Sequence, residues 1–200
     1  GAINAAVRIS KGAYLMKLDA HCAVAEGFDE VLQADCADNW LVVPRRLPLD
    51  GETWLTEQRT DDKYPIDYEF LSYGFQKWPD ENSGLHGEPW RDRRRSRASV
   101  LVDEDPSFQG SCWFMSRKHW DRTIGQMDDV SYGHFIYEPQ ELGLKTWLSG
   151  GSVMVNKKTN YHHLYKGTRY GRGWSKNDAR IRDGRLFGID FWMHDRWPQA

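Results

Sequence analysis

A carboxylate and an imidazole stand two residues apart at Asp19 and His21, directly after the mostly apolar run 13–18. Residues i and i+2 of an extended chain point to the same side, so both side chains can converge on one cation. An oxygen and a nitrogen ligand together suit Mn²⁺ or another borderline divalent ion better than Ca²⁺. The same spacing is also typical of an ordinary turn at a strand end, which on spacing alone is the commoner outcome.

Two adjacent histidines, His162 and His163, follow a strand that the sequence predicts over residues 152–156. After a short polar link, either imidazole could join a metal site. Neighbouring residues of a strand face opposite ways, so only one of the two can do so. The other is then a surface group or a neighbour of the ligands. In the simpler alternative, both are polar residues of a loop.

A third candidate is the pair Glu138 and Glu141, at the start of a helix predicted over residues 138–149. Their spacing places them on one helix face. Acidic residues in a first turn also stabilise the helix dipole, which would explain both without any function. In the functional interpretation, Glu138 projects into a cleft and binds a substrate hydroxyl or acts as a base. Pro139 removes a backbone donor, so this helix start is poorly suited to holding a phosphate.

The elements that must position these residues follow an α/β pattern. The predicted helices cover residues 3–10, 27–36, 117–125 and 138–149. The predicted strands cover residues 13–18, 40–44, 107–116 and 152–156. The run 40–44 is continuously apolar, which is typical of a central strand buried on both faces. Strand, helix and strand in succession indicate an α/β unit with a parallel sheet.

The segment from about residue 48 to 100 has weaker periodicity and many Pro, Gly, Asp and Arg residues. We interpret it as a variable excursion that contains a few short strands, one of them near 66–73. Its basic stretch RDRRRSR, residues 91–97, offers five arginines that could grip phosphate groups. Charge runs of this kind are more often solvated surface loops, which is the simpler interpretation.

Composition limits the class of protein. A chain of 200 residues with 40% hydrophobic and 28% charged residues suits one soluble globular domain. The net charge of −2 gives no global indication of binding to nucleic acid or to an anionic membrane. Three cysteines without a CxxC pair argue against a disulfide framework or a structural zinc site and predict a cytoplasmic location. No apolar run approaches the ~20 residues that a membrane span needs.

Taken in order, these segments resemble the family 2 type of GT-A glycosyltransferase, and most closely its polypeptide N-acetylgalactosaminyltransferase branch. Five segments of this chain are similar to motifs of the family. LDAHC (18–22) resembles the family's LDxHC, GSCWFM (110–115) its GG-x-F, and YGHFIYEPQE (132–141) its WGGEN-x-E. HHLYK (162–166) resembles its GHVFR, and WMHD (192–195) its WMDE. The resemblance covers most of the chain except about 48–100. As an ordered set the motifs are more specific than any one of them alone.

The resemblance implies a GT-A (nucleotide-diphospho-sugar transferase) fold, with a mixed, mostly parallel sheet flanked by helices. It implies one catalytic domain over residues 1–200 that is truncated at its N-terminus, because nothing here matches the family's first nucleotide-binding strands. It also implies a metal-dependent transfer of a sugar from a nucleotide-sugar donor, expected to be a UDP-sugar, to an acceptor hydroxyl. A glycan, a protein and a modified nucleic acid all stay open as the acceptor.

The resemblance also implies roles for individual residues. Asp19, His21 and His163 would bind Mn²⁺, or Mg²⁺, which holds the diphosphate of the donor. Glu138 and Glu141 would be the catalytic carboxylates. The residues that bind the donor would be Gly110, Ser111, Trp113, Lys166, Arg169, Tyr170 and Arg172. The last four lie on a basic, Gly-rich segment, about 166–186, which is expected to close over the diphosphate as a lid.

Two departures from the family pattern keep other functions open. Pro139 stands where inverting relatives have an Asp base and where the retaining branch has Asn, so the stereochemical outcome is not predicted. His162 stands where the family has a Gly before its metal-binding His. One alternative is therefore a catalytically degenerate domain that binds carbohydrate. Another is a sugar-nucleotide nucleotidyltransferase, which would need a Gly-rich phosphate loop near its N-terminus.

Overall fold

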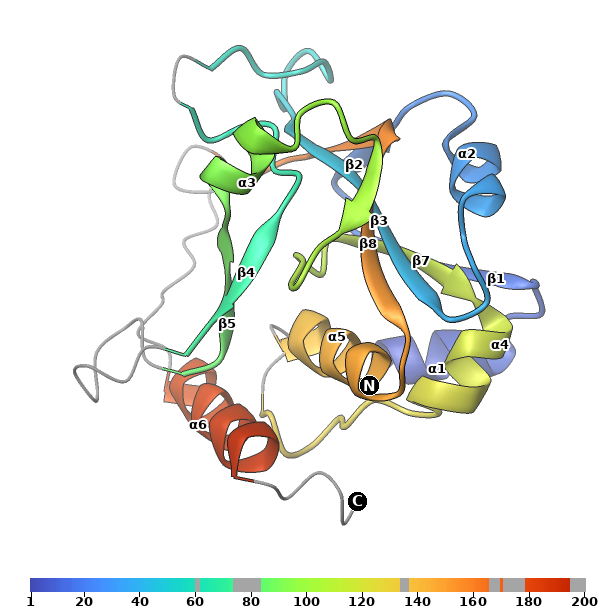
Figure 1. The fold of residues 1–200 in the computed structure, drawn as a ribbon, viewed down its shortest axis with the longest axis vertical. Coiled ribbons are helices and arrows are strands. Elements are labelled where there is room, and N and C mark those ends of the chain that lie inside the picture. Colours follow the sequence, from blue (N-terminus) through green and yellow to red (C-terminus); the bar gives the residue numbers. More distant parts are fainter. Residues whose placement is uncertain (60–61, 74–83, 134–136, 166–169, 171–178, 195–200) are drawn as a thin grey trace.

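A computed structural model describes residues 1–59, 62–73, 84–133, 137–165, 170 and 179–194 (Figure 1). Its main sheet has the strand order β1-β7-β3-β8-β2, and β6 pairs with β8 beside this path. The strands are β1 (Tyr14–Leu18), β2 (Cys22–Val24), β3 (Trp40–Pro48), β6 (Val102–Glu104), β7 (Cys112–Ser116) and β8 (Ser152–His163). The helices around it are α1 (Ala2–Ile9), α2 (Phe28–Ala34), α4 (Arg117–His119), the π-helix η1 (Trp120–Ile124) and α5 (Glu138–Leu148).

The sheet is mixed, as expected, but among the described strands it is not mostly parallel. Only β3 and β8 pair in parallel, whereas β1 with β7, β3 with β7, β2 with β8 and β6 with β8 are antiparallel. The strand–helix–strand unit from β1 to β3 does run in the predicted direction. However, β7 lies between these two strands and is antiparallel to both, so β1 and β3 do not pair with each other.

Both faces of the sheet are covered, which explains the continuous apolar run of β3. Leu41 and Val43 of β3 pack into a core cluster with residues of α1, η1 and α5. Val42, the residue between them, packs into a second cluster that includes Leu32 of α2. Because successive strand residues face opposite sides, a strand between two helical layers must be apolar at every position. The prediction of a central buried strand is confirmed (Figure 1).

The excursion forms a small second sheet beside the first. Strands β4 (Glu69–Ser72) and β5 (His86–Pro89) pair antiparallel, and β4 confirms the short strand expected near 66–73. Single bridges tie the excursion to the main sheet, for example between Arg46 and Ile66. Helix α6 (Ala179–Met193) lies near the far end of the hairpin, where Leu85 belongs to the same apolar cluster as its Ile189 (Figure 1).

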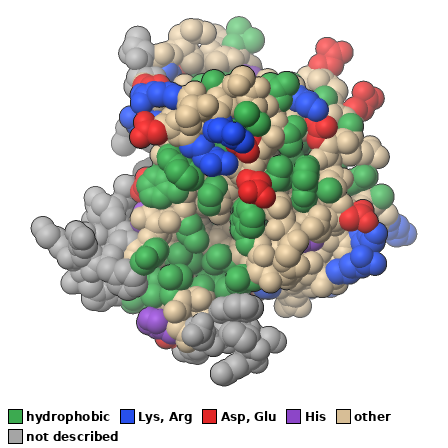
Figure 2. All heavy atoms as spheres, in the orientation of Figure 1, with side chains coloured by type: hydrophobic (Ala, Val, Ile, Leu, Met, Phe, Trp, Pro, Cys, Tyr) green, Lys and Arg blue, Asp and Glu red, His purple; other side chains and the backbone are tan. Residues whose placement is uncertain are grey.

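The arginine-rich stretch is not a loop but helix α3 (Arg91–Ser96). Four of the five arginines in 91–97 pair with neighbouring acids: Arg94 and Arg95 pair with Asp62, and Arg93 and Arg97 pair with Asp103. Figure 2 shows arginine and acidic side chains side by side over α3. The arginines therefore hold the excursion together, and the argument for a phosphate-binding patch loses its basis.

Other parts of the structure agree with the predictions from the sequence to differing degrees. The helix predicted over 117–125 is a single α-helical turn, α4, that continues as the π-helix η1. The proposed lid, about 166–186, falls largely outside the described residues, and its last part belongs to α6. Among the described residues, no helix is long and apolar enough to cross a bilayer.

Candidate metal and donor site

Asp19 and His21 lie in the turn that connects β1 to β2. The backbone N–H of Cys22 donates to the carbonyl of Asp19 at 3.2 Å, so the chain reverses here and does not stay extended as expected. Asp19 N–H donates to the carbonyl of Ser111 at 2.9 Å, and the His21 carbonyl accepts from Leu164 N–H at 3.1 Å. The two side chains converge because this turn is fixed to both neighbouring strands.

His163 reaches the turn from β8, which is longer than predicted. The strand continues past Asn156 through a bulge opposite Pro44 and Arg45 of β3, and it ends with His163 paired to Cys22 of β2. The polar residues after Asn156 concealed this extension in the sequence. His162 faces the other way and bonds through Nε2 to Thr56 Oγ1 at 2.7 Å. The structure thus brings His163, and not His162, to Asp19 and His21.

Asp19, His21 and His163 together form a cluster that could hold a metal ion. Their ligand atoms all lie within 4.8 Å of one another. Asp19 Oδ2 is 3.5 Å from His163 Nε2 and 3.9 Å from His21 Nε2, and the two imidazole rings are tilted with centroids 4.7 Å apart. One carboxylate oxygen and two imidazole nitrogens form a donor set that fits Mn²⁺.

The carboxyl group of Asp19 is held in its charged form. Burial alone raises its pKa, but hydrogen bonds from His163 and Lys17 outweigh that effect and lower the pKa to about 2. His163 Nδ1 is buried without a hydrogen-bond partner among the described residues. The cluster thus offers an ionised oxygen, and a divalent cation would replace the proton that lies between His163 Nε2 and this oxygen.

Lys17 is a member of the site that the sequence reasoning missed. Its ammonium group donates to Asp19 Oδ1 at 2.6 Å and to the carbonyl of Gly110, and it lies 3.7 Å from Glu138 Oε2. The signal was available in the sequence, because a lysine two residues before Asp19 on a strand points to the same side as that carboxylate.

Glu138, the first residue of α5, is 7% exposed and lies close to this cluster. Its Oε1 accepts a hydrogen bond from Trp113 Nε1, and its Oε2 faces Lys17. Burial raises the pKa of this carboxyl to about 7, although Lys17 and Trp113 counteract part of the effect. A carboxyl group that titrates near neutrality can act as an acid or a base at physiological pH.

The structure does not bring Glu141 to the same place. Glu141 is 2% exposed, and its Oε1 accepts from the backbone N–H of Asp128 at 2.8 Å and from Lys145 Nζ at 2.8 Å. These contacts fix the loop before α5 to the helix. They give Oε1 of Glu141 a structural role, whereas Oε2 is buried without a hydrogen-bond partner among the described residues.

Trp113, Gly110 and Ser111 lie beside the cluster, but they support it from within the protein. Trp113 is 1% exposed and stacks on Trp120 with ring centroids 6.0 Å apart, so its link to the site is the hydrogen bond to Glu138. A Cβ at Gly110 would lie 3.2 Å from the Pro139 ring, a tight contact that favours glycine where this loop crosses α5.

Ser111 Oγ bonds to Gln109 at 2.9 Å and to the Tyr161 hydroxyl at 2.7 Å. Gln109 in turn donates to the hydroxyl of Tyr165 at 2.9 Å, and the Tyr165 ring packs edge-on against that of His163. Ser111 is therefore part of a polar network that ends at the metal-ligand cluster. Of the predicted lid residues, Lys166, Arg169 and Arg172 lie outside the described residues, and the Tyr170 hydroxyl accepts from Gly51 N–H at 3.2 Å.

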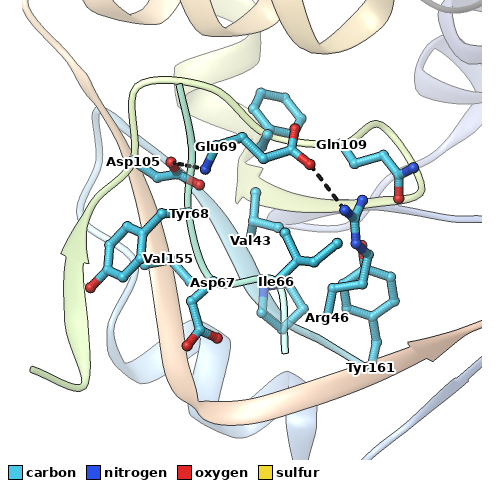
Figure 3. Close-up of a pocket in the computed structure, with 12 residues that line it drawn as sticks. Val43, Arg46, Ile66, Asp67, Tyr68, Glu69, Asp105, Gln109, Val155 and Tyr161 are labelled. Atoms are coloured by element: carbon cyan, nitrogen blue, oxygen red, sulfur yellow. Dashed lines mark hydrogen bonds and ion pairs between the residues drawn. The ribbon is translucent and has the colours of Figure 1, made fainter. Parts of the chain in front are cut away.

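A buried charged cluster lines a small pocket behind this network (Figure 3). Arg46 donates to Glu69 at 3.0 Å, and the backbone N–H of Glu69 donates to Asp105 at 2.9 Å. Burial raises the pKa of the Asp105 carboxyl well above its usual value. The cluster joins β3, β4 and the loop that leads to Gly110, and it thereby fixes the loop beside the candidate site.

Comparisons with known proteins bear on the fold of the chain and on the proteins that it resembles. No protein-family model matches the chain. Two Drosophila melanogaster proteins, provisionally named polypeptide N-acetylgalactosaminyltransferases 13 and 9, are 28% identical over 171 residues and 25% identical over 191 residues. The alignments cover 82% and 93% of this chain, but the chain spans only 27% of the length of either relative.

Among solved structures, GalNAc-T7 in complex with UDP, GalNAc and Mn²⁺ superposes with a TM-score of 0.69 at 18% sequence identity. The match covers 97% of this chain and 35% of the GalNAc-T7 chain. At this identity the structural likeness establishes the fold alone. The chain therefore has the GT-A fold, and its sequence is similar to those of two polypeptide N-acetylgalactosaminyltransferases.

Proposed function

We propose that this protein is a Mn²⁺-dependent glycosyltransferase that moves a sugar from a UDP-sugar to an acceptor hydroxyl. The convergence of Asp19, His21 and His163 from separate segments carries the proposal. The presence of UDP, GalNAc and Mn²⁺ in the GalNAc-T7 structure supports this donor and this metal. The donor sugar and the acceptor are not fixed by these observations.

In this proposal the protein holds the donor through its diphosphate. Asp19 Oδ2 and the Nε2 atoms of His21 and His163 would bind the metal. A divalent ion there supplies positive charge that offsets the charge developing on the departing nucleoside diphosphate. Lys166, Arg169, Tyr170 and Arg172 would contact the same diphosphate from the lid segment. Glu138, beside the ligands, would contact the sugar or the acceptor hydroxyl.

The proposal predicts the result of removing one ligand. We expect Asp19→Ala to abolish Mn²⁺-dependent turnover of a UDP-sugar, because only imidazole nitrogens remain to bind the ion. The measurement is UDP release by the full-length protein with and without Mn²⁺. Asp92→Ala is the matched control, since the Asp92 side chain is 90% exposed on α3. Full activity of the Asp19 variant would refute the metal assignment.

One observation favours a second candidate, a domain that binds carbohydrate without turning it over. Both oxygens of Glu138 already face protein groups, and Pro139 follows it where a base stands in other enzymes. The same assay separates the two functions. A protein that binds UDP-sugar in the presence of Mn²⁺ but releases no UDP, with or without acceptor, is the binding domain.

A further inference from the structure

Lys17 connects three segments that meet at the site. Its ammonium has three N–H donors, and the structure places one carboxylate or carbonyl oxygen from each segment around it. These are Asp19 Oδ1 after β1, the Gly110 carbonyl before β7 and Glu138 Oε2 at the start of α5. The Lys17 side chain is 22% exposed, so the group is partly shielded from water.

The contact with Lys17 also orients Asp19. Because Oδ1 is engaged by the ammonium, Oδ2 is the oxygen that faces His21 and His163, at 3.9 and 3.5 Å. Asp19 is thus set to bind a metal ion through one oxygen. At Glu138 the two oxygens are divided in the same way, with Trp113 on Oε1 and Lys17 on Oε2.

The positive charge of Lys17 makes the binding of a metal ion at the same site less favourable. The ammonium group contacts Oδ1 of Asp19, and a cation bound to Oδ2 would lie on the other side of the same carboxylate. Two positive charges at that separation repel each other, more strongly where water is partly excluded. Removing the charge should therefore favour the metal. The same removal would leave the buried Glu138 carboxylate without its cationic neighbour, which is unfavourable.

The following inference rests on the proposed function. We propose that Lys17 is a positioning residue that connects Asp19 to Glu138. Its positive charge at the same time weakens the binding of the metal ion. If Lys17 had only a structural role, its removal would change the metal affinity in the opposite direction. Loss of its contacts would loosen Asp19 and weaken the binding of Mn²⁺. The sign of the change in metal affinity therefore separates the two roles.

The first experiment measures the Mn²⁺ dissociation constant of the full-length protein by the paramagnetic resonance of free Mn²⁺. We expect Lys17→Met to bind Mn²⁺ about tenfold more tightly, because the repelling charge is gone. We also expect its UDP release to fall at least about tenfold, because Glu138 is no longer held. Lys17→Arg keeps the charge and should return the affinity toward the native value. Lys118→Met, at an exposed Lys–Asp pair, is the control.

The second experiment needs neither metal nor turnover. Unfolding temperatures are measured for metal-free Lys17→Met, Glu138→Gln and the double variant. We expect the two single shifts not to add, because each variant removes the same contact. Additive shifts, or unchanged or weaker Mn²⁺ binding by Lys17→Met, would overturn the role of Lys17. A native protein that binds no Mn²⁺ would instead refute the proposed function, and non-additive shifts would then still support the link between Lys17 and Glu138.

Discussion

At the scale of single residues, the alternation of a strand separates two histidines that look equivalent in the sequence. His163 faces Asp19, whereas His162 bonds to Thr56 on the other side. The same rule accounts for Lys17, which shares a side with Asp19. Strand alternation does not predict how closely two segments that are distant in the sequence approach each other. Nothing in the local pattern shows that Glu138 approaches Lys17 or that Glu141 bonds to Asp128.

The two histidines give a direct test of this alternation. We expect His163→Ala to weaken Mn²⁺ binding by at least about tenfold, because it removes one of three ligands. His162→Ala should change the affinity less than about twofold, because only the bond to Thr56 is lost. Calorimetric titration with Mn²⁺ measures both. Equal losses in the two variants would contradict the orientation of β8.

The raised pKa of Glu138 makes stability depend on pH. The pKa of this carboxyl is about 7 in the metal-free folded protein and has its ordinary value of 4.5 when the chain is unfolded. Between these values the folded state binds more protons, so the free energy of unfolding falls as pH rises. Glu138→Gln removes the titrating carboxyl group, and with it this fall in the free energy of unfolding. Relative to the native protein, we expect the variant to gain up to about 3 kcal/mol between pH 4.5 and 8.

Urea unfolding of both metal-free proteins across this pH range measures the effect. Glu104→Gln, at an exposed carboxylate on β6, is the control and should show no such gain. A difference between native protein and Glu138→Gln that stays constant with pH would mean that Glu138 titrates normally.

At the scale of elements, pairing partners outweigh local composition. The polar run after Asn156 reads as a loop, yet β8 continues because β3 and β2 supply hydrogen-bond partners up to His163. The stretch 91–97 reads as a solvated loop, yet it is helical, with its arginines bound to Asp62 and Asp103. In both cases the deciding partners are remote in the sequence. Propensity is a weak guide where such contacts are available.

Asp103 of β6 is the acid on which the attachment of α3 depends. Its carboxylate accepts hydrogen bonds from Arg97 and Tyr68, and the bond from Arg97 contributes most to lowering the pKa to about 2 despite partial burial. We expect Asp103→Asn to lower the free energy of unfolding by about 1–3 kcal/mol at pH 7. A carboxyl whose pKa is lowered stabilises the fold above its unfolded value near 3.8, and this contribution disappears as pH falls through 2.

The loss should therefore shrink in acid, and thermal unfolding at pH 7 and at the lowest pH where the protein still folds tests this. Asp121→Asn, at an exposed site on η1, serves as the control. A loss of equal size at both pH values would show that the charge of Asp103 does not hold α3.

At the scale of the whole molecule, the sheet is covered by helices on both faces, and the excursion stands beside it as a small second sheet (Figure 1). The site lies where β1 and β8 end and β2 begins, and the loop before β7 and the start of α5 close it from the side of Glu138. The excursion contributes Glu69, which joins Arg46 of β3 and Asp105 in a buried cluster behind the loop to Gly110 (Figure 3).

The order of residues alone predicted most helices and the buried central strand, and it singled out Asp19, His21 and one of the pair His162 and His163 as candidates for a metal site. These features depend on short-range periodicity, on strand alternation and on residue chemistry, all of which are local properties of the chain. The direction of the strand pairings, the reach of β8, the helical state of 91–97 and the meeting of Lys17 with Glu138 came only with folding. They depend on which distant segments pack together, because hydrogen-bond partners and burial are supplied by the rest of the molecule and not by neighbours in the sequence.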